Sequence, residues 1–301
     1  MRQTTDHVLM VRPVNFSFNE ETSVNNAFQN KPEGSVTENA TAEFDSYVAL
    51  LRQNGVVVDV LHDTPEPHTP DSIFPNNCFS THRSADGKKI LVLYPMFAPN
   101  RQMEQDKLML RIQPGAFHSV VDLRSYTTKG MFLEGTGSMV LDREKKIAYA
   151  CLSPRTHEPL LRTWASRTGY EVIIFESQDR RNIPVYHTNV MMHVGSRFAV
   201  VCLDSVRNAE QRTRLTDILQ HSGKEIVEIS LEQMDHFAGN MLELHNKNRD
   251  KLLIMSLTAL QSLKREQITL LEKDVRIVAP DIHTIETVGG GSARCMLAEI
   301  F

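Results

Sequence analysis

The residue of this chain best suited to covalent chemistry is Cys295. A thiolate is a strong nucleophile, and an adjacent cation such as Arg294 favours that form of the thiol. The glycines at 289–291 precede it, and glycine permits positive φ and close approach of a ligand to the backbone. The competing interpretation of a free cysteine, a small buried hydrophobe, fits the three that lie inside apolar stretches: Cys78, Cys151 and Cys202. Cys295 is therefore the candidate nucleophile.

Two further residues could supply acid–base chemistry to that thiol. His187, in the run His-Thr-Asn, could protonate a leaving amine and then activate water. Glu134, in the run Leu-Glu-Gly, could orient the imidazole or accept a substrate N–H. Each has an ordinary alternative, a hydrogen-bonded surface histidine and a solvated turn carboxylate. His193 is a second candidate base.

Other kinds of site are not indicated. The chain has no Gly-x-Ser-x-Gly elbow, and its Gly-Gly-Gly-Ser run at 289–292 is not followed by the lysine of a phosphate loop. His62 and His68 lie in a proline-rich stretch without the spacing of metal ligands. We therefore expect no metal and no other cofactor.

Composition narrows the class of partner. The chain has 301 residues and a formal net charge of -4, which argues against nucleic acid or an anionic membrane as partner. No signal-like segment opens it, and its longest apolar runs, such as 198–203, are the size of strands. The four cysteines then indicate reduced thiols. We expect a cytoplasmic protein with a small-molecule partner.

A weak internal repeat could bring these residues together. Each unit has two short apolar strands, a helix-like stretch and a further β-rich stretch. The first strands start at positions separated by 61, 51, 51 and 54 residues, namely Asn77, Ser138, Asn189, Asn240 and Arg294. The expected helices cover 42–53, 103–112, 159–165, 211–220 and 263–273. The β-rich stretches that follow them are 56–60, 120–123, 171–175, 226–229 and 275–278.

The last unit lacks strands that the start of the chain can supply. The apolar strand at 7–11 has no partner of its own, and pairing it with the final unit would close the array and remove an exposed sheet edge. The predicted fold is α/β: a pseudo-symmetric propeller of five ββαβ units that forms one domain over 1–301. An open α/β sheet is the alternative. In the closed array the strand starts face one end of the axis, where distant polar residues could converge.

The same motifs resemble those of the guanidino-group-modifying superfamily, which comprises arginine deiminases, dimethylarginine hydrolases and amidinotransferases and shares a five-unit α/β propeller, the pentein fold. The segment 290–296 is similar to its terminal glycine-rich Cys motif, 133–135 to its Leu-Glu-Gly motif, and 187–189 to its His-x-Asp motif. Including stretches at 12–13 and 28–29, the chain looks closest to bacterial citrulline-utilisation hydrolases.

Departures from the superfamily pattern bear on the substrate. Where arginine deiminases carry aspartates that bind the cationic guanidinium, this chain has Asn77, Gly137 and Asn189. A buried cation would lack its partners, whereas an asparagine offers a donor and an acceptor to a neutral ureido group. The resemblance therefore implies a hydrolase that converts citrulline to ornithine, ammonia and carbon dioxide through a thiocarbamoyl Cys295.

The resemblance also implies roles for binding residues. Asn77 and Asn189 would bind the ureido group, Asp71 the α-amino group and Arg294 the carboxylate. The loop 13–34, which is polar with scattered Phe, is either a lid or a long surface excursion. A deiminase, dimethylarginine hydrolase or amidinotransferase that acts on a guanidino group is the alternative. A non-catalytic binding module is a further alternative, because a ribosome anti-association factor has the same propeller.

Overall fold

Five three-stranded sheets form the architecture of the described part of the chain. The computed structural model describes residues 2–32, 34, 36–84, 86–109, 112 and 114–301. The strands are β1 (His7–Arg12), β2 (Val57–His62), β3 (Phe79–Arg83), β4 (Lys89–Leu93), β5 (Ser119–Asp122), β6 (Val140–Asp142), β7 (Ile147–Cys151), β8 (Glu171–Phe175), β9 (Met192–Val194), β10 (Phe198–Val201), β11 (Glu225–Glu228), β12 (Leu242–His245), β13 (Lys251–Ile254), β14 (Arg276–Val278) and β15 (Ala298–Glu299).

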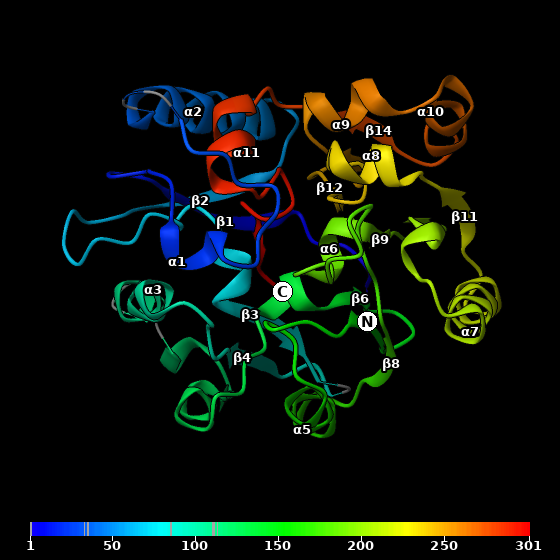
Figure 1. The fold of residues 1–301 in the computed structure, drawn as a ribbon, viewed down its shortest axis with the longest axis horizontal. Helices are drawn as coiled ribbons and strands as arrows, with labels where there is room; N and C mark the ends of the chain where they lie inside the picture. The colour runs from blue at the N-terminus through cyan, green and yellow to red at the C-terminus, as the bar shows by residue number, and fades with distance from the viewer. Residues whose placement is uncertain (1, 33, 35, 85, 110–111, 113) are drawn as a thin grey trace.

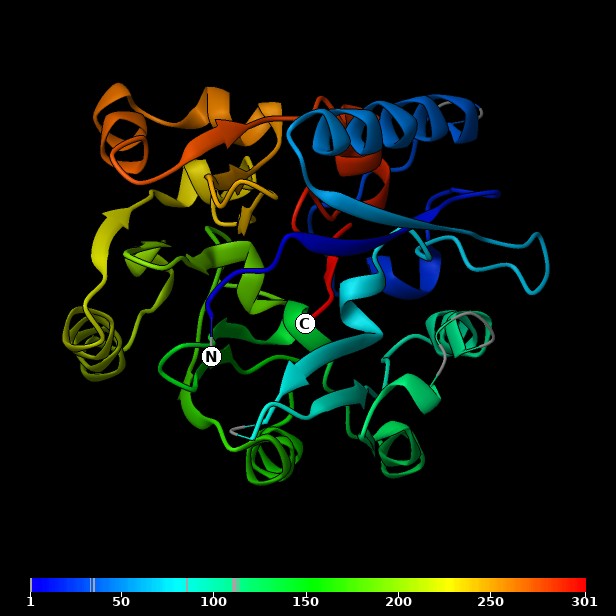
Figure 2. The ribbon, with the colours of Figure 1, turned by 180° about the vertical axis from the view of Figure 1, so that it is seen from behind.

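Helices connect the sheets and cover their rim. They are α1 (Glu20–Ser23), α2 (Thr37–Gln53), α3 (Pro99–Met109), α4 (Gly135–Ser138), α5 (Glu158–Thr168), α6 (Thr188–Met191), α7 (Ala209–His221), α8 (Leu231–Asp235), α9 (Leu257–Ser262), α10 (Arg265–Leu271) and α11 (His283–Gly289), with short 3-10 turns η1 (Pro75–Asn77), η2 (Pro114–Ala116), η3 (Arg124–Lys129) and η4 (Leu203–Ser205). Figures 1 and 2 show the sheets around a central axis, with the longer helices outside them.

Every sheet has the same pairing pattern. In the sheet β3-β4-β5, β4 pairs antiparallel with β3 and parallel with β5. Because a parallel neighbour needs a crossover connection, a helix runs between the two parallel strands: α3 in this sheet, α5 between β7 and β8, and α7 between β10 and β11. The repeated ββαβ unit predicted from the sequence is confirmed.

Strand β1 closes the ring. It pairs antiparallel with β15, where Val8 lies opposite Glu299, and parallel with β2, where Val8 lies opposite Val58. The chain start therefore completes the fifth sheet, as the unpaired strand at 7–11 predicts. Closure places β15, and with it the preceding Cys295 turn, beside the first unit.

Most predicted helices form, and one is divided. Helix α5 ends at Gly169, whose φ of 73° is the left-handed conformation that glycine adopts at helix ends. The helix predicted over 263–273 is instead α9 and α10. Between them the extended Leu263 buries its side chain in the core, and Gln267 accepts the backbone N–H of Lys264 to begin the second helix.

All five predicted first strands start later than expected; in the fourth unit β12 begins at Leu242 and not at Asn240. Asn77, Ser138 and Asn189 lie in the helical turns η1, α4 and α6, and the strands begin at Phe79, Val140 and Met192. These turns satisfy their backbone groups locally, as where the N–H groups of Gly137 and Ser138 both donate to the carbonyl of Glu134 at 3.0 Å. The functional side chains thus project from tight turns.

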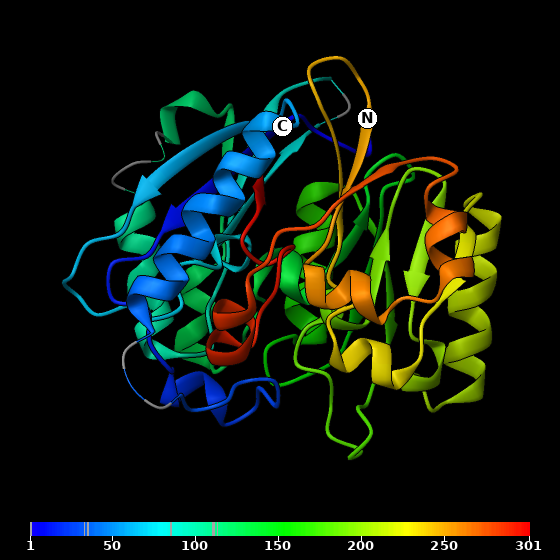
Figure 3. The ribbon, with the colours of Figure 1, turned by 90° about the horizontal axis from the view of Figure 1, so that it is seen from above.

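The same correction applies to the last unit. Cys295 lies in a turn over 293–296, and its N–H donates to the carbonyl of Ser292 at 2.9 Å. Strand β15 begins only at Ala298. Figure 3 shows both chain termini at one end of the axis and α1 at the other.

Candidate active site

A small cavity brings together residues from distant parts of the chain. It is lined by Asn26, Asp71, Phe74, Asn77, Arg101, Arg155, Tyr186, His187, Gly289, Gly290, Gly291 and Cys295. Four of the seven predicted site residues are among them: Cys295, His187, Asn77 and Asp71. Of the other three, Glu134 lies behind His187, whereas Asn189 and Arg294 line a separate hollow.

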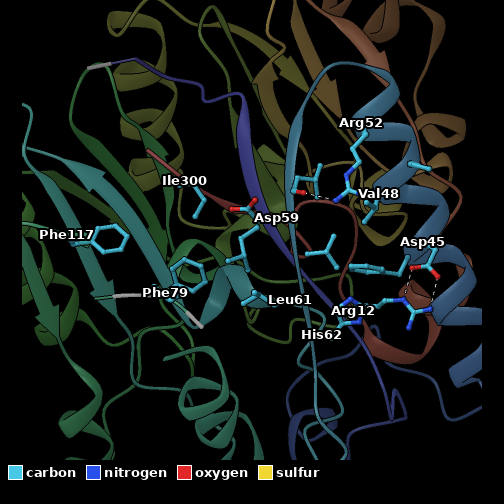
Figure 4. Close-up of a pocket in the computed structure, with 16 residues that line it drawn as sticks. Arg12, Asp45, Val48, Arg52, Asp59, Leu61, His62, Phe79, Phe117 and Ile300 are labelled. Carbon is cyan, nitrogen blue, oxygen red and sulfur yellow. Dashed lines mark hydrogen bonds and ion pairs between the residues drawn. The ribbon is translucent and has the colours of Figure 1, made fainter. Parts of the chain in front are cut away.

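A larger hollow lies elsewhere. It is an open groove against β2 and α2, with the ion pair of Arg12 and Asp45 at 2.8 Å on one side and Phe79, Phe117 and Ile300 on the other (Figure 4). None of the seven predicted site residues lines it. The site is therefore located by its chemistry and not by its size.

Glu134 stands directly behind His187 and is fully buried. Its Oε2 lies 2.8 Å from His187 Nε2, and its Oε1 accepts the backbone N–H of Phe97 at 2.8 Å. Two cations also approach Oε2, Arg155 Nη1 at 3.6 Å and Arg101 Nη1 at 4.0 Å. The carboxylate is thereby fixed against the imidazole.

The charges of this pair follow from its surroundings. Burial opposes ionisation of Glu134, but Arg155, His187 and Arg101 outweigh it and hold the pKa of the carboxyl well below its usual range. Burial lowers the pKa of His187 to about 4, against the opposing effect of Glu134. At neutral pH the histidine is therefore neutral. Because a carboxylate only accepts, Nε2 carries the proton and Nδ1 is a free base.

The free nitrogen needs the glycine beside it. A Cβ at Gly137 would lie 2.7 Å from His187 Nδ1 and would also collide with Asn77 Nδ2. At this position arginine deiminases have an aspartate. The glycine instead leaves room for the imidazole base and the Asn77 amide to lie next to each other.

Cys295 is 3% exposed and is reached by two side-chain amides. Asn240 Nδ2 lies 3.2 Å from its Sγ and Asn189 Nδ2 lies 3.5 Å away. The preceding glycines shape this turn: Gly290 ends α11 with a φ of 63°, and a Cβ at Gly289 would lie 2.7 Å from the ring of Phe74. They therefore provide a helix end and close packing.

The amides of Asn77 and Asn189 differ in which atom lacks a hydrogen-bond partner among the described residues. Arg101 Nη1 donates to Asn77 Oδ1 at 2.9 Å, which leaves Asn77 Nδ2 buried and without a hydrogen-bond partner among the described residues. Asn189 directs Nδ2 to the thiol, and its buried Oδ1 has no partner in the same part of the chain. One amide offers a donor and the other an acceptor.

Asp71 joins the cavity to the segment above it. Its Oδ2 accepts from Asn19 Nδ2 at 2.8 Å and from Thr22 Oγ1 at 3.0 Å, whereas its Oδ1 is buried without a partner within the described structure. Burial raises the pKa of Asp71, and Arg101 is the strongest group opposing this. A ligand cation would restore the missing contact.

Arg294 does not line the cavity. Its guanidinium donates to Glu299 Oε2 at 3.0 Å and to the carbonyl of Leu297 at 2.8 Å. It lines a separate hollow, which also contains His193. Adjacent residues of a tight turn point in different directions, so the side chain beside the thiol in sequence lies away from the cavity. His193 is likewise not positioned as the base.

The cavity cations are two arginines that sequence reasoning missed. Arg101 pairs with Glu104 at 3.0 Å within α3, an i,i+3 spacing visible in the sequence. Arg155 follows a Ser-Pro turn and donates from Nη2 to the carbonyl of Thr22 at 2.8 Å and from Nε to Asn25 Oδ1 at 2.8 Å. These contacts span more than 100 residues and have no local signal.

The segment 19–30 lies across the cavity. Besides the contacts to Asp71 and Arg155, Asn26 Nδ2 donates to the carbonyl of Gly290 at 3.3 Å, and the N–H of Asn30 donates to the carbonyl of Thr287 at 2.8 Å. Of the loop 13–34, Asn26 lines the cavity together with Cys295. Residue 33 of that range is outside the described residues.

The remaining cysteines have structural surroundings. Cys78, Cys151 and Cys202 are all buried, and burial raises the pKa of each thiol, to about 11 for Cys151 and Cys202. Within the described ranges, no group of three or more His, Cys, Asp and Glu residues could hold a metal ion. No helix described here is long and apolar enough to cross a membrane.

Comparison with solved structures shows the fold. ArgZ, an arginine dihydrolase from the ornithine-ammonia cycle in cyanobacteria, matches in its unliganded form with a TM-score of 0.75 and 19% identity over 97% of this chain and 40% of that chain. The N-terminal domain of a cysteine-to-serine variant of ArgZ, bound to substrate, matches with a TM-score of 0.76 and 18% identity over 97% of each chain. The chain thus spans about two fifths of full-length ArgZ.

A dimethylarginine dimethylaminohydrolase matches as well. Its histidine-to-glycine variant, solved as an adduct with S-methyl-L-thiocitrulline, has a TM-score of 0.65 and 16% identity over 98% of this chain and 99% of that chain. No curated protein matches. These comparisons confirm the pentein fold of the guanidino-group-modifying superfamily, but they do not support a particular closeness to citrulline-utilisation hydrolases.

The match to a family model covers nearly the whole chain. The family is described as N,N dimethylarginine dimethylhydrolase, eukaryotic, and its model matches residues 12–301. This range contains every residue of the cavity and all five sheets except part of β1. The chain therefore belongs to this N,N dimethylarginine dimethylhydrolase family.

Proposed function

We propose that this protein is a cysteine-dependent hydrolase of a guanidino C–N bond in an amino acid. The observation that carries the proposal is the joint burial of the Cys295 thiol and the His187–Glu134 pair around one cavity. The family name and the arginine dihydrolase ArgZ add support, since both refer to guanidino substrates. This places the guanidino alternative ahead of citrulline.

The chemistry would run in two steps. Sγ of Cys295 forms a bond to the planar guanidino carbon while the thiol proton passes to His187 Nδ1. His187 then gives this proton to the departing amine, which leaves an amidino thioether on the cysteine. In the second step His187 takes a proton from water, the hydroxide adds to the same carbon, and the Cys295 thiolate departs and regains a proton from His187 as the product is released. Glu134 stabilises the imidazolium that forms in both steps.

The amino acid end of the substrate has two partners in this proposal. The free Oδ1 of Asp71 would accept from the α-ammonium group. Arg155 would bind the α-carboxylate, because its nearest carboxylate, Glu134, lies 3.6 Å away, whereas Arg101 is paired with Glu104 at 3.0 Å. This assignment replaces Arg294, whose guanidinium is bound to Glu299.

A ureido group is the second candidate, and one observation favours it. Arg101 holds Asn77 so that its Nδ2 donor, and not its carbonyl, is free. A ureido C=O accepts such a donor, whereas a guanidinium offers only N–H groups. Citrulline therefore remains a substrate to test.

The deciding experiment is a comparison of substrates. Purified protein is incubated separately with arginine, an N,N-dimethylated arginine and citrulline, and released amines, ammonia, citrulline and ornithine are quantified. We expect turnover of a guanidino compound, loss of turnover in Cys295→Ser, and full activity in the control Cys202→Ser.

The other outcomes are equally informative. Turnover of citrulline alone would replace the guanidino proposal with the ureido one. Tight binding of these compounds without any turnover would identify a binding module and remove the proposed chemistry altogether.

A further inference from the structure

Asn240 is the closest hydrogen-bond donor to the candidate nucleophile among the described residues. It is fully buried and occupies, in the fourth unit, the position that Asn77 and Asn189 occupy in the first and third. The motifs discussed above assign it no role. Its Nδ2 lies 3.2 Å from Cys295 Sγ.

The orientation of the Asn240 amide is fixed by two backbone groups. Its Oδ1 accepts the N–H of Arg294 at 3.0 Å, and its Nδ2 donates to the carbonyl of Asn189 at 3.0 Å. Rotating the amide by 180° would set oxygen against oxygen and N–H against N–H. The nitrogen end is therefore the nearer of the two to Sγ, at 3.2 Å against 3.7 Å for Oδ1, and this order does not depend on how the two ends of the amide are assigned.

We propose that Asn240 is a catalytic residue that stabilises, through this N–H donor, the negative charge that develops on Cys295 Sγ as the thiol proton passes to His187. A hydrogen bond to the charged form of a group favours that form. The guanidinium of Arg294, next to Cys295 in sequence, donates its hydrogen bonds to Glu299 and to the carbonyl of Leu297 and not to the thiol. The proposal rests on the proposed covalent function of Cys295.

Asn189 and Asn240 both contact the sulfur, but we expect different roles for them. Both direct Nδ2 to Sγ, but Asn189 lines the separate hollow that also contains Arg294 and His193, and Asn240 is the nearer donor. The Oδ1 of Asn240 accepts the backbone N–H of Arg294, so this amide acts on the sulfur and not on the substrate. Loss of the Asn240 donor should therefore lower kcat with little change in KM.

The test replaces the donor and retains the rest. Asn240→Asp keeps an oxygen for the Arg294 N–H but places a carboxylate oxygen against Sγ. The rate of alkylation of Cys295 by iodoacetamide is measured against pH on the full chain, with the modified peptide identified by mass spectrometry. We expect the pH of half-maximal alkylation to rise by about one unit or more, and kcat to fall by roughly 100-fold, the effect of losing one preorganised donor.

A matched control is available on the surface. Asn208 caps α7 by accepting the N–H groups of Glu210 and Gln211, which an aspartate does equally well, so Asn208→Asp should leave both measurements unchanged. Asn240→Ala, which removes the donor without adding charge, serves if Asn240→Asp does not fold.

Two outcomes would overturn the proposal. A folded Asn240→Asp variant whose alkylation profile matches the wild type would show that the amide does not act on the thiol. Failure of both variants to fold would make Asn240 a purely structural residue. Because alkylation needs no substrate, these outcomes are distinct from a failure of the proposed hydrolase activity.

Discussion

His187 Nε2 lies 2.8 Å from Glu134 Oε2, and this contact determines which imidazole nitrogen serves as the base. The carboxylate keeps the proton on Nε2, so that Nδ1, beside Gly137, is free to accept one. The negative charge of Glu134 also balances the positive charge that His187 gains when it is protonated. The imidazolium that forms during the reaction is matched by a carboxylate that is already ionised.

Replacing Glu134 with glutamine should remove the negative charge that faces protonated His187. We expect kcat to fall by roughly 100-fold or more, the usual contribution of an oriented acid–base group, because His187 would gain its proton without a facing negative charge. The measurement is kcat against pH for the preferred substrate. Glu232→Gln, at an exposed glutamate, is the control. Equal kcat in wild type and Glu134→Gln would contradict the assigned role.

Asp71→Asn should weaken binding of substrates that carry an α-amino group. A hydrogen bond to a charged group contributes about 1.5–3 kcal/mol, so kcat/KM should fall by roughly 10- to 100-fold. The same comparison with a guanidino acid that lacks the α-amino group should show a much smaller difference. An equal loss with both compounds would mean that Asp71 supports the segment 19–30, through Asn19 and Thr22, and does not bind the amine.

Arg294 should matter for stability and not for substrate binding. Arg294→Met leaves Glu299 buried with Arg143 as its remaining partner at 3.2 Å, and loss of one member of a buried ion pair costs about 3–5 kcal/mol. Unfolding in urea gives this free energy, and KM should stay close to the wild-type value. Arg162→Met, at an exposed ion pair with Glu158, should cost less than about 1 kcal/mol. A large rise in KM for Arg294→Met would show instead that Arg294 takes part in substrate binding.

Acid should destabilise the protein through His193. Burial lowers its pKa from 6.5 to about 3, so below pH 6.5 the unfolded chain binds a proton that the native state does not. The stability contributed by neutral His193 is present above that value and decreases by about 1.4 kcal/mol for each pH unit below it. Urea unfolding at pH 6.5 and 5 should therefore show a loss about 2 kcal/mol smaller in His193→Gln than in wild type. Parallel losses in the two proteins would show that His193 does not titrate in this way.

The architecture could be predicted from the sequence because each repeated unit has its own pattern of strands and a helix, which is visible within a short stretch of the chain. Five similar strand-helix-strand patterns at regular spacing, and one unpaired strand at the start, define the closed ring without any knowledge of side-chain direction. The same spacing brought Cys295, His187 and Asn77 to one cavity. Asn240 is one of the regularly spaced strand starts as well, but the spacing alone does not predict that its amide contacts the sulfur of Cys295.

Side-chain direction could not be obtained in this way. Arg294 is adjacent to Cys295 in sequence but turns toward Glu299, whereas Arg155 reaches the cavity through contacts with the segment 19–30. Both directions depend on packing between units that are far apart in the chain. The choice between guanidino and ureido groups depends likewise on which end of the Asn77 amide Arg101 occupies.

The ring closure of β1 with β15 also has a consequence for folding kinetics. The amides that contact Cys295 Sγ lie 55 and 106 residues away in sequence, and the strand that closes its sheet comes from the opposite end of the chain. Such non-local contacts form late, because the loop entropy must be lost before they contribute. Until these contacts form, the thiol of Cys295 lacks both amide donors, so we expect its reactivity to appear together with ring closure and not before it.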